Sequence, residues 1–227
     1  MGKNKIRKFT EINSFSNVIQ PQSHHASAPF EYKGQWNQSF FGQQNPIVLE
    51  IGCGKGEYTV ALGENSPEQN FIGIDIKGDR IWKGAREALD RGLHNVAFLR
   101  ILAERLPEFF APGEINCIWL TFPDPQLKKI RHKKRLTAPR FLDIYKKLLA
   151  PDSPIHLKTD NEALFNYTLE VIREQGHYLA AHTFDLYSDD TIQEPLVKEI
   201  QTFYEKKFLE KGDRIHYMKF FLHDENR

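Results

Sequence analysis

The sequence predicts an α/β fold in which a parallel sheet carries helices on both faces. From Pro46 onwards, apolar strand-like segments alternate with helical ones, and this pattern produces parallel strands joined by helices. The first strand-like segment runs into a glycine-rich turn at residues 52–56, and the next one ends at Asp75, about 20 residues later. A strand, a glycine turn and an acid in this order are typical of the front half of a nucleoside-cofactor site.

The expected elements follow one another without a linker between domains. Strands are expected at residues 47–51, 70–75, 95–99, 115–121, 155–159, 177–185 and 214–221. Helices are expected at residues 57–64, 79–92, 104–110, 139–149, 162–175 and 195–210. Gly92 closes one of these helices, and Pro139 occupies the first turn of another. A chain of 227 residues is long enough for one well-packed domain with additions.

Residues 1–45 differ in composition from the rest of the chain. They are rich in Ser, Asn and Gln, are interrupted by prolines, and show no sustained period of 2 or 3.6. We expect an N-terminal arm that is partly disordered, docks through Phe30, Tyr32 and Trp36, and could contact RNA. Residues 46–227 are expected to form the main domain.

The composition argues against several classes of protein. The apolar runs are shorter than a membrane span needs, and no secretory apolar core follows the N-terminus, so we expect a cytoplasmic protein. Cys53 and Cys117 are the only cysteines, and we expect no disulfide. Neither the cysteines nor the histidines, including the pair His24 and His25, have metal-ligand spacing, so no metal is expected.

The net charge is only +1, but the positive charges are clustered. Residues 128–135 hold six fixed positive charges in eight positions, and Lys3, Lys5, Arg7 and Lys8 form a second cluster. A charge run is most often a solvated face. Beside a cofactor site, however, such a tract is well suited to bind the phosphates of a nucleic acid.

Acidic residues lie at or just after the ends of four predicted strands. Glu50, Asp75, Asp124 and Asp160 all lie at carboxyl ends of strands, where parallel α/β sheets bind their ligands, so we expect them to converge. A single Asp in such a place can simply cap a helix, and Asp160 could cap the helix near residue 162. Asp124 is flanked by Pro123 and Pro125, which fix the backbone on both sides and favour a substrate or catalytic role.

The spacing of the glycines separates two classes of cofactor. Dinucleotide sites have G-x-G-x-x-G, whereas this chain has G-x-G-x-G with Glu50 two residues ahead of the first glycine. The pattern resembles the first motif of S-adenosylmethionine-dependent methyltransferases. Their cofactor is a cation without phosphate, so an acid beside the loop is tolerable there, whereas it would repel a pyrophosphate. A dinucleotide enzyme and a purely structural glycine turn remain alternatives.

A more specific resemblance covers residues 46–222. The segments Glu50-Ile-Gly-Cys-Gly-Lys-Gly, Gly73-Ile-Asp75, Phe122-Pro-Asp-Pro, the basic tract 128–135 and the T-x-x-E pattern at 202–205 resemble the bacterial tRNA (guanine-N7-)-methyltransferase family. The resemblance implies a Rossmann-like class I methyltransferase fold with a seven-stranded, mostly parallel sheet whose last strand is reversed. It also implies methyl transfer from S-adenosylmethionine to N7 of a variable-loop guanine in tRNA.

The resemblance implies roles for individual residues. The cofactor-binding residues would be Glu50, Gly52, Gly54, Gly56, Asp75, Leu102, Ala103 and Asp124, with Asp124 also catalytic. The substrate-binding residues would be Lys128, His132, Arg135, Asp160, Thr202 and Glu205, the last two closing the guanine pocket. Two departures stand out: Gln126-Leu127-Lys128 replaces the usual residues after the PDP and shifts the register of the tract, and Leu102 replaces the acid expected near the adenine.

Two rival functions remain open. An adenine or protein amino-methyltransferase has a D/N-P-P-aromatic loop after the same strand, whereas Asp124 is flanked by single prolines and followed by Gln126. A non-catalytic RNA-binding partner subunit could share the fold, although the intact glycines and Asp75 argue against it. We expect a monomer or homodimer that needs no partner protein.

Overall fold

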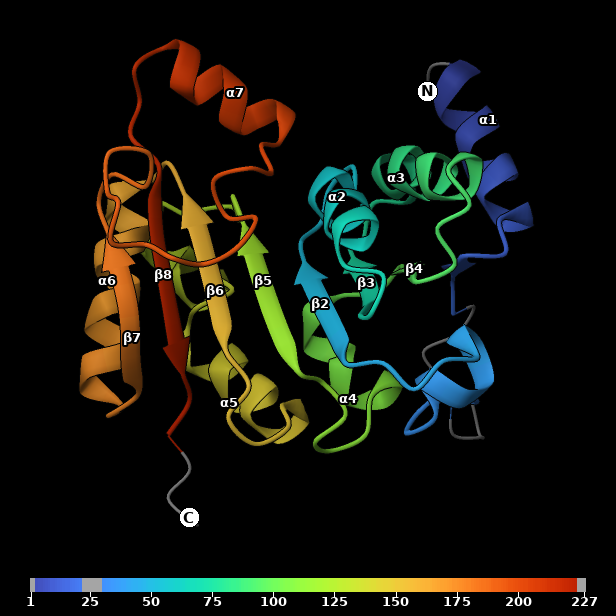
Figure 1. Cartoon of the computed structure of the whole chain (residues 1–227), viewed down its shortest axis with the longest axis horizontal. Helices are drawn as coiled ribbons and strands as arrows, with labels where there is room; N and C mark the ends of the chain where they lie inside the picture. The colour runs from blue at the N-terminus through green and yellow to red at the C-terminus, as the bar shows by residue number, and fades with distance from the viewer. Residues whose placement is uncertain (1–2, 22–29, 224–227) are drawn as a thin grey trace.

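The computed structural model of the chain describes residues 3–21 and 30–223, and these residues contain one eight-stranded sheet. Figure 1 shows its strands with helices packed around them. The strands are β1 (Val18–Ile19), β2 (Ile47–Ile51), β3 (Asn70–Ile74), β4 (Val96–Leu99), β5 (Cys117–Thr121), β6 (Ile155–Thr159), β7 (Tyr178–Thr183) and β8 (His216–Phe221). The α-helices are α1 (Lys3–Glu11), α2 (Glu57–Asn65), α3 (Gly78–Asp90), α4 (Leu106–Phe109), α5 (Pro139–Leu148), α6 (Glu162–Glu174) and α7 (Phe203–Glu210).

The order of the strands is β1-β4-β3-β2-β5-β6-β8-β7. Strands β1 to β6 pair in parallel, whereas β8 runs antiparallel to both of its neighbours, β6 and β7. The predicted parallel sheet with a reversed last strand is therefore confirmed, and β1 adds an eighth strand at one edge. Chain order reverses between β2 and β5, so a ligand is expected beyond the carboxyl ends of these strands.

Each face of the sheet has its own apolar core. In β2, Leu49 and Ile51 belong to the core that includes Phe141 and Phe165 of α5 and α6, whereas Val48 belongs to the core that includes Ile81 of α3. Successive side chains of a strand point to opposite faces, so a fully buried strand needs apolar residues at nearly every position. Glu50 is the one charged residue in this strand, and it is buried.

Part of the N-terminal arm forms regular secondary structure, in α1 and β1. Helix α1 packs against α3, where Trp82 donates a hydrogen bond to Glu11 at 3.1 Å, and β1 pairs with β4. The expected docking of aromatic residues is present: Trp36 is fully buried and stacks on Phe110. Because β1 has two residues, it is too short to produce a visible period. Residues 22–29 of the arm lie outside the described residues.

The predicted helix at residues 195–210 is wrong in its first half. Only α7 is helical, and it begins after Thr202, whose hydroxyl accepts a hydrogen bond from the Glu205 amide. Leu196 has a positive φ of 64°, which a helix does not contain. The carbonyls of Val197 and Ile200, which an extended helix would use internally, accept hydrogen bonds from a buried lysine instead.

Candidate active site

The glycine loop at residues 52–56 joins β2 to α2, and its backbone takes conformations that favour glycine. Gly54 and Gly56 have φ values of 56° and 71°. A Cβ atom on Gly56 would lie 2.5 Å from the ring of Phe98 and 3.2 Å from the Cα of Gly84, so this glycine lets α2 pack closely against β4 and α3. A Cβ atom on Gly54 would meet no atom within 4 Å, so the loop leaves open space there for a ligand.

Asp75 links the glycine loop to the end of β3. One of its carboxylate oxygens accepts a hydrogen bond from the Gly54 amide at 3.0 Å, and the other accepts one from the Lys77 amide at 2.8 Å. A carboxylate has about four lone-pair sites, so it can accept further bonds from ribose hydroxyls. Asp75 is half-buried, and the structure places it beside the open loop, where the sequence predicts the cofactor ribose.

Glu50 lies beneath the loop rather than at its surface. It is 3% exposed and accepts hydrogen bonds from the amide and hydroxyl of Thr59 in α2 and from the hydroxyl of Thr121 in β5. Burial raises the pKa of Glu50 to about 7, although the bonds from Thr121 and Thr59 act in the opposite direction. Its contacts thus tie together three elements that surround the predicted cofactor site.

Asp124 is exposed on a tightly fixed loop after β5. The residues before and after the Pro-Asp-Pro sequence, Phe122 and Gln126, both have positive φ, and the Gln126 amide donates a hydrogen bond to the Asp124 carboxylate at 2.9 Å. Arg135 is only 4% exposed, and its Nε donates to the carbonyl of Pro125 at 2.9 Å. The guanidinium also lies 4.3 Å from the ring centre of Tyr167. Arg135 therefore holds the loop in place, and its side chain does not face solvent.

Four other cations of the basic tract face solvent. Residues Lys129–Lys134 form a short 3-10 helix, and Lys128, Arg131, Lys133 and Lys134 are exposed. His132 is half-buried, with its ring 6.1 Å from that of Tyr167. The tract begins three residues after Pro125, so its exposed charges lie on the same loop as Asp124.

A buried ion pair connects the sheet to α7. Lys158 in β6 and Glu205 in α7 are both 0% exposed, with Nζ and Oε1 2.7 Å apart. The same ammonium donates to the carbonyls of Val197 at 2.6 Å and Ile200 at 3.0 Å, and Tyr187 donates its hydroxyl to Glu205 at 2.8 Å. All three donors of the lysine are therefore used, although burial still lowers its pKa.

The T-x-x-E pattern forms a helix capping box. The Thr202 hydroxyl accepts a hydrogen bond from the Glu205 amide at 3.2 Å, and Glu205 accepts one from the Thr202 amide at 3.4 Å. Both predicted pocket residues are thus committed to the start of α7, which lies at the end of the sheet to which β5 and β6 point (Figure 1). The Phe203 amide donates to Glu57 in α2 at 2.8 Å, so α7 adjoins the helix that follows the glycine loop.

Asp160 does not cap the helix that follows it. The side chain of Asn161 accepts the capping bond from the Leu164 amide at 2.9 Å, which leaves the Asp160 carboxylate available. Partial burial raises the pKa of Asp160.

Leu102 and Ala103 lie after β4, where Leu102 is 43% exposed and Ala103 is buried. The structure therefore brings Asp75, Asp124, Asp160 and Leu102 to one edge of the sheet.

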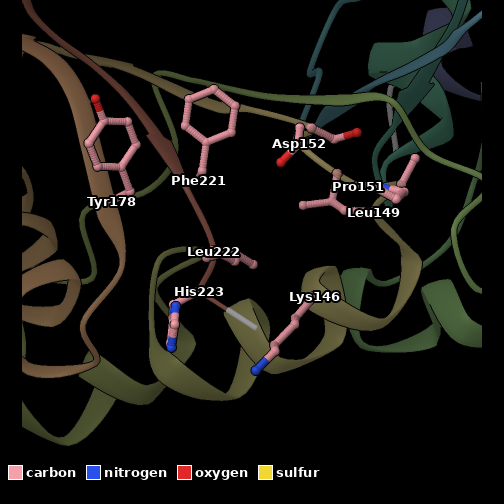
Figure 2. Close-up of a pocket in the computed structure, with 10 residues that line it drawn as sticks. Lys146, Leu149, Pro151, Asp152, Tyr178, Phe221, Leu222 and His223 are labelled. Atoms are coloured by element: carbon pink, nitrogen blue, oxygen red, sulfur yellow. The ribbon is translucent and has the colours of Figure 1, made fainter. Parts of the chain in front are cut away.

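A pocket of about 490 Å³ lies at the opposite edge (Figure 2). Tyr178 and Phe221 from the paired strands β7 and β8 form one side, and Asp152, Lys146 and His223 are among its other residues. This edge holds the amino ends of the parallel strands, where α/β sheets do not bind their cofactors. Size alone therefore does not identify the functional site.

The sequence analysis assigned no role to several residues that support the carboxyl edge. A lysine within a five-residue strand expected to be buried is a recognisable signal, because lysine is almost never buried without a partner, and Lys158 has this position. The T-x-x-E pattern is also a capping-box signature in any sequence. Thr59 and Thr121 gave no signal, since their role depends on contact with a residue far away in the sequence.

Two further observations concern the part of the chain that the structure describes. Its helices are all too short or too polar to cross a bilayer. Among the described side chains, no group of three or more His, Cys, Asp or Glu residues is arranged to hold a metal ion.

Comparison with known proteins relates the chain to methyltransferases. The model of a family described as "Putative methyltransferase" matches residues 44–218. A tRNA (guanine-N(7)-)-methyltransferase from Bacteroides thetaiotaomicron is 49% identical, over 99% of this chain and 88% of that protein. One from Christiangramia forsetii is also 49% identical, over 96% and 97%. One from a Geobacillus species is 38% identical, over 83% of each chain.

Solved structures support the fold at lower identity. The 16S rRNA methyltransferase KamB superposes with a TM-score of 0.64 and 16% identity, covering 88% of this chain and 97% of that one. An antibiotic-related methyltransferase gives a TM-score of 0.60 and 18% identity, covering 82% and 92%. At these identities the likeness shows that the architecture is shared.

Proposed function

The chain belongs to the tRNA (guanine-N(7)-)-methyltransferase family, and we propose that it methylates N7 of a guanine in tRNA, in the variable loop. The observation that supports this most directly is the exposed Asp124, which stands at the carboxyl edge beside exposed cations and near an open glycine loop. A tRNA substrate also implies that the protein acts in the cytoplasm. We retain a monomer or homodimer without an obligatory partner protein as part of the proposal.

The residues at the carboxyl edge fit S-adenosylmethionine. Gly54 leaves open space above the loop, and Asp75 can accept bonds from ribose hydroxyls. Ile76, next to Asp75, and Leu102, one strand further on, expose apolar surface. S-adenosylmethionine supplies a methyl group bonded to a positively charged sulfur. Glu50 is tied beneath the loop by Thr59 and Thr121, so in this proposal it sets the shape of the loop.

The chemistry at guanine N7 requires positioning more than proton transfer. N7 carries an in-plane lone pair, so the protein need not remove a proton before methyl transfer, and alignment can supply much of the reduction in the barrier. The guanine ring gains positive charge in the reaction. Carboxylates that accept hydrogen bonds from its N1–H and exocyclic amine would stabilise that charge.

Asp124 and Asp160 are the acids best placed for this role. Neither carboxylate is committed to an ion pair in the described contacts, whereas Glu205 is bound by Lys158 and Tyr187. We therefore assign guanine recognition to Asp124 and Asp160, and we assign to Thr202 and Glu205 the placement of α7. The exposed cations Lys128, Arg131, Lys133 and Lys134 would bind tRNA phosphates, and His132 would lie beside them.

The proposal is tested with matched tRNA transcripts that carry guanine or 7-deazaguanine at the target position. The modified base keeps its N1–H, amine and carbonyl, so both transcripts should bind with the same affinity. Only the guanine transcript should accept a radiolabelled methyl group, because carbon replaces N7 in the other. Equal methylation of the two would reject N7 as the acceptor and favour an amino-methyltransferase. Binding without methylation of either would favour a non-catalytic RNA-binding protein.

A further inference from the structure

A pocket of about 270 Å³ lies at the carboxyl edge, one strand beyond Asp75. Its walls come from three parts of the chain that are distant in sequence: Gln20 and Pro21 before the undescribed part of the N-terminal arm, Ile76 after β3, and Arg100, Leu102 and Arg105 after β4. A nucleoside whose ribose is bound by Asp75 would place its base on this side, away from β2 and the glycine loop.

Arg100 holds the N-terminal wall against the other two. Its amide donates to the carbonyl of Ile19 at 2.9 Å, extending the parallel pairing of β1 with β4. Its guanidinium donates through Nη1 to Gln20 Oε1 and through Nε to the carbonyl of Ile76, both at 3.0 Å. Gln20 is also anchored by its own amide nitrogen, which donates to Asn13 at 2.8 Å.

The pocket has the chemistry of an adenine site. Ile76 is 49% exposed and Leu102 43% exposed, and these large apolar side chains could cover the faces of a planar base. Among the side chains that line the pocket, only that of Gln20 contains a hydrogen-bond acceptor, since those of Arg100 and Arg105 can only donate. The carbonyl oxygen of Gln20 has two lone pairs, and Arg100 uses one of them.

We propose that the N-terminal segment forms a wall of the adenine pocket and that Gln20 accepts a hydrogen bond from the exocyclic amine of the cofactor. Gln20 thereby supplies the acceptor that Leu102 lacks, and Arg100 acts as the positioning residue that fixes its orientation. This inference rests on the proposed function for the identity of the cofactor. It assigns a binding role to a segment outside residues 44–218, which the family model matches.

The test compares two cofactor products by calorimetry, S-adenosylhomocysteine and S-inosylhomocysteine. They differ at the six position of the base, where an amine donates in one and a carbonyl accepts in the other, and at N1, which accepts in adenine and donates in hypoxanthine. The change in preference on replacing Gln20 isolates the contribution of this side chain. The wild-type protein should prefer the adenosyl compound by about tenfold, the size expected for one hydrogen bond. Gln20→Ala should lose this preference, whereas Gln20→Glu should keep it because a carboxylate still accepts.

Gln193→Ala is the matched control, because Gln193 is an exposed glutamine whose amide donates to the Asp190 carbonyl in a loop distant in sequence from all three walls. It should keep the wild-type preference. An unchanged preference in Gln20→Ala would overturn the inference and leave the proposed function standing. Failure of the wild-type protein to bind either compound would overturn both.

Discussion

The cofactor side and the substrate side of the carboxyl edge are built by different means. On the cofactor side, backbone groups define the shape, as in the Gly54 and Lys77 amides that bind Asp75. On the substrate side, side chains fix the shape: Lys158 and Glu205 secure α7, and Arg135 secures the loop that carries Asp124. The first arrangement depends on neighbouring strands, whereas the second depends on pairs of residues far apart in the sequence.

This difference predicts how each side responds to substitution. A site made from backbone groups tolerates most changes of side chain except at glycines and at the acid that joins them. A site held by buried ions fails when either partner is lost, because the remaining charge stays buried without compensation. The following substitutions test this contrast.

The largest effect is expected from Lys158→Met. The change leaves the Glu205 carboxylate and two backbone carbonyls buried without the lysine, and removing one partner of a buried pair costs about 3–5 kcal/mol. Urea unfolding measures this loss. Lys219→Met is the control, since Lys219 in β8 has a 2.7 Å ion pair with Glu194 that is about a quarter exposed. Equal destabilisation by the two variants would contradict the prediction that the substrate side depends on its buried ion pair.

Glu50→Gln tests whether the cofactor side also contains a buried charge. Burial raises the Glu50 pKa from 4.5 to about 7, so the cofactor-free folded state binds this proton more tightly than the unfolded state. The stabilisation of the folded wild-type protein by protonated Glu50 is therefore full below about pH 4.5, and it is lost as the pH rises through about 7. The stability of Glu50→Gln relative to wild type should increase by up to about 3 kcal/mol between pH 5 and 8. A difference that does not change with pH would contradict this.

Asp124→Ala should act on the reaction alone. The Asp124 side chain is exposed, and the Gln126 amide is its one hydrogen-bond partner among the described contacts, so the melting temperature should not change. We expect kcat to fall about 100-fold, as for loss of a group that stabilises developing charge. Asp90→Ala on α3 serves as the control for an exposed acid. A kcat within threefold of wild type would exclude Asp124 from the active site.

The smallest effect is expected from removing exposed charges of the basic tract. The triple replacement of Arg131, Lys133 and Lys134 by Ala should weaken tRNA binding about tenfold. The slope of the logarithm of the binding constant against the logarithm of the salt concentration should become less negative by about 2. Arg135 is left intact, because its side chain supports the Asp124 loop. The same change at Lys83, Arg91 and Lys147 is the control. Identical salt slopes for the two triple variants would mean that the tract is only a solvated face.

The cofactor side was largely predictable from the sequence because its signals are local. Strands β2 and β6 have the predicted bounds, since each is a five-residue segment buried along its whole length. The glycine spacing and Asp75 likewise lie within about 25 residues of one another. Glu50 was assigned to the cofactor on the same basis, yet its burial depends on Thr121, which only the folded sheet brings close.

The substrate side was less predictable because long-range contacts override local preference. Val197 and Ile200 have helical spacing with later apolar residues, but Lys158 binds their carbonyls and α7 starts only at Phe203. Arg135 has the composition of an RNA contact, but its side chain is buried against Tyr167. No pattern within the tract distinguishes this arginine from its exposed neighbours.

The insertion of β8 between β6 and β7 has a consequence for how the protein is made. The last described strand of the chain fills an interior position of the sheet, so neither neighbour has its full set of partners until residues 216–221 have been synthesised. During translation the residues of β2, β3, β4 and β5 are synthesised before those of β6, β7 and β8. Lys158 cannot form its ion pair until Glu205 has also been synthesised. The ion pair that secures α7 and the pairing of β6 with β8 can therefore form only after residues 205 and 216–221 have been made, well after the segments of the cofactor side.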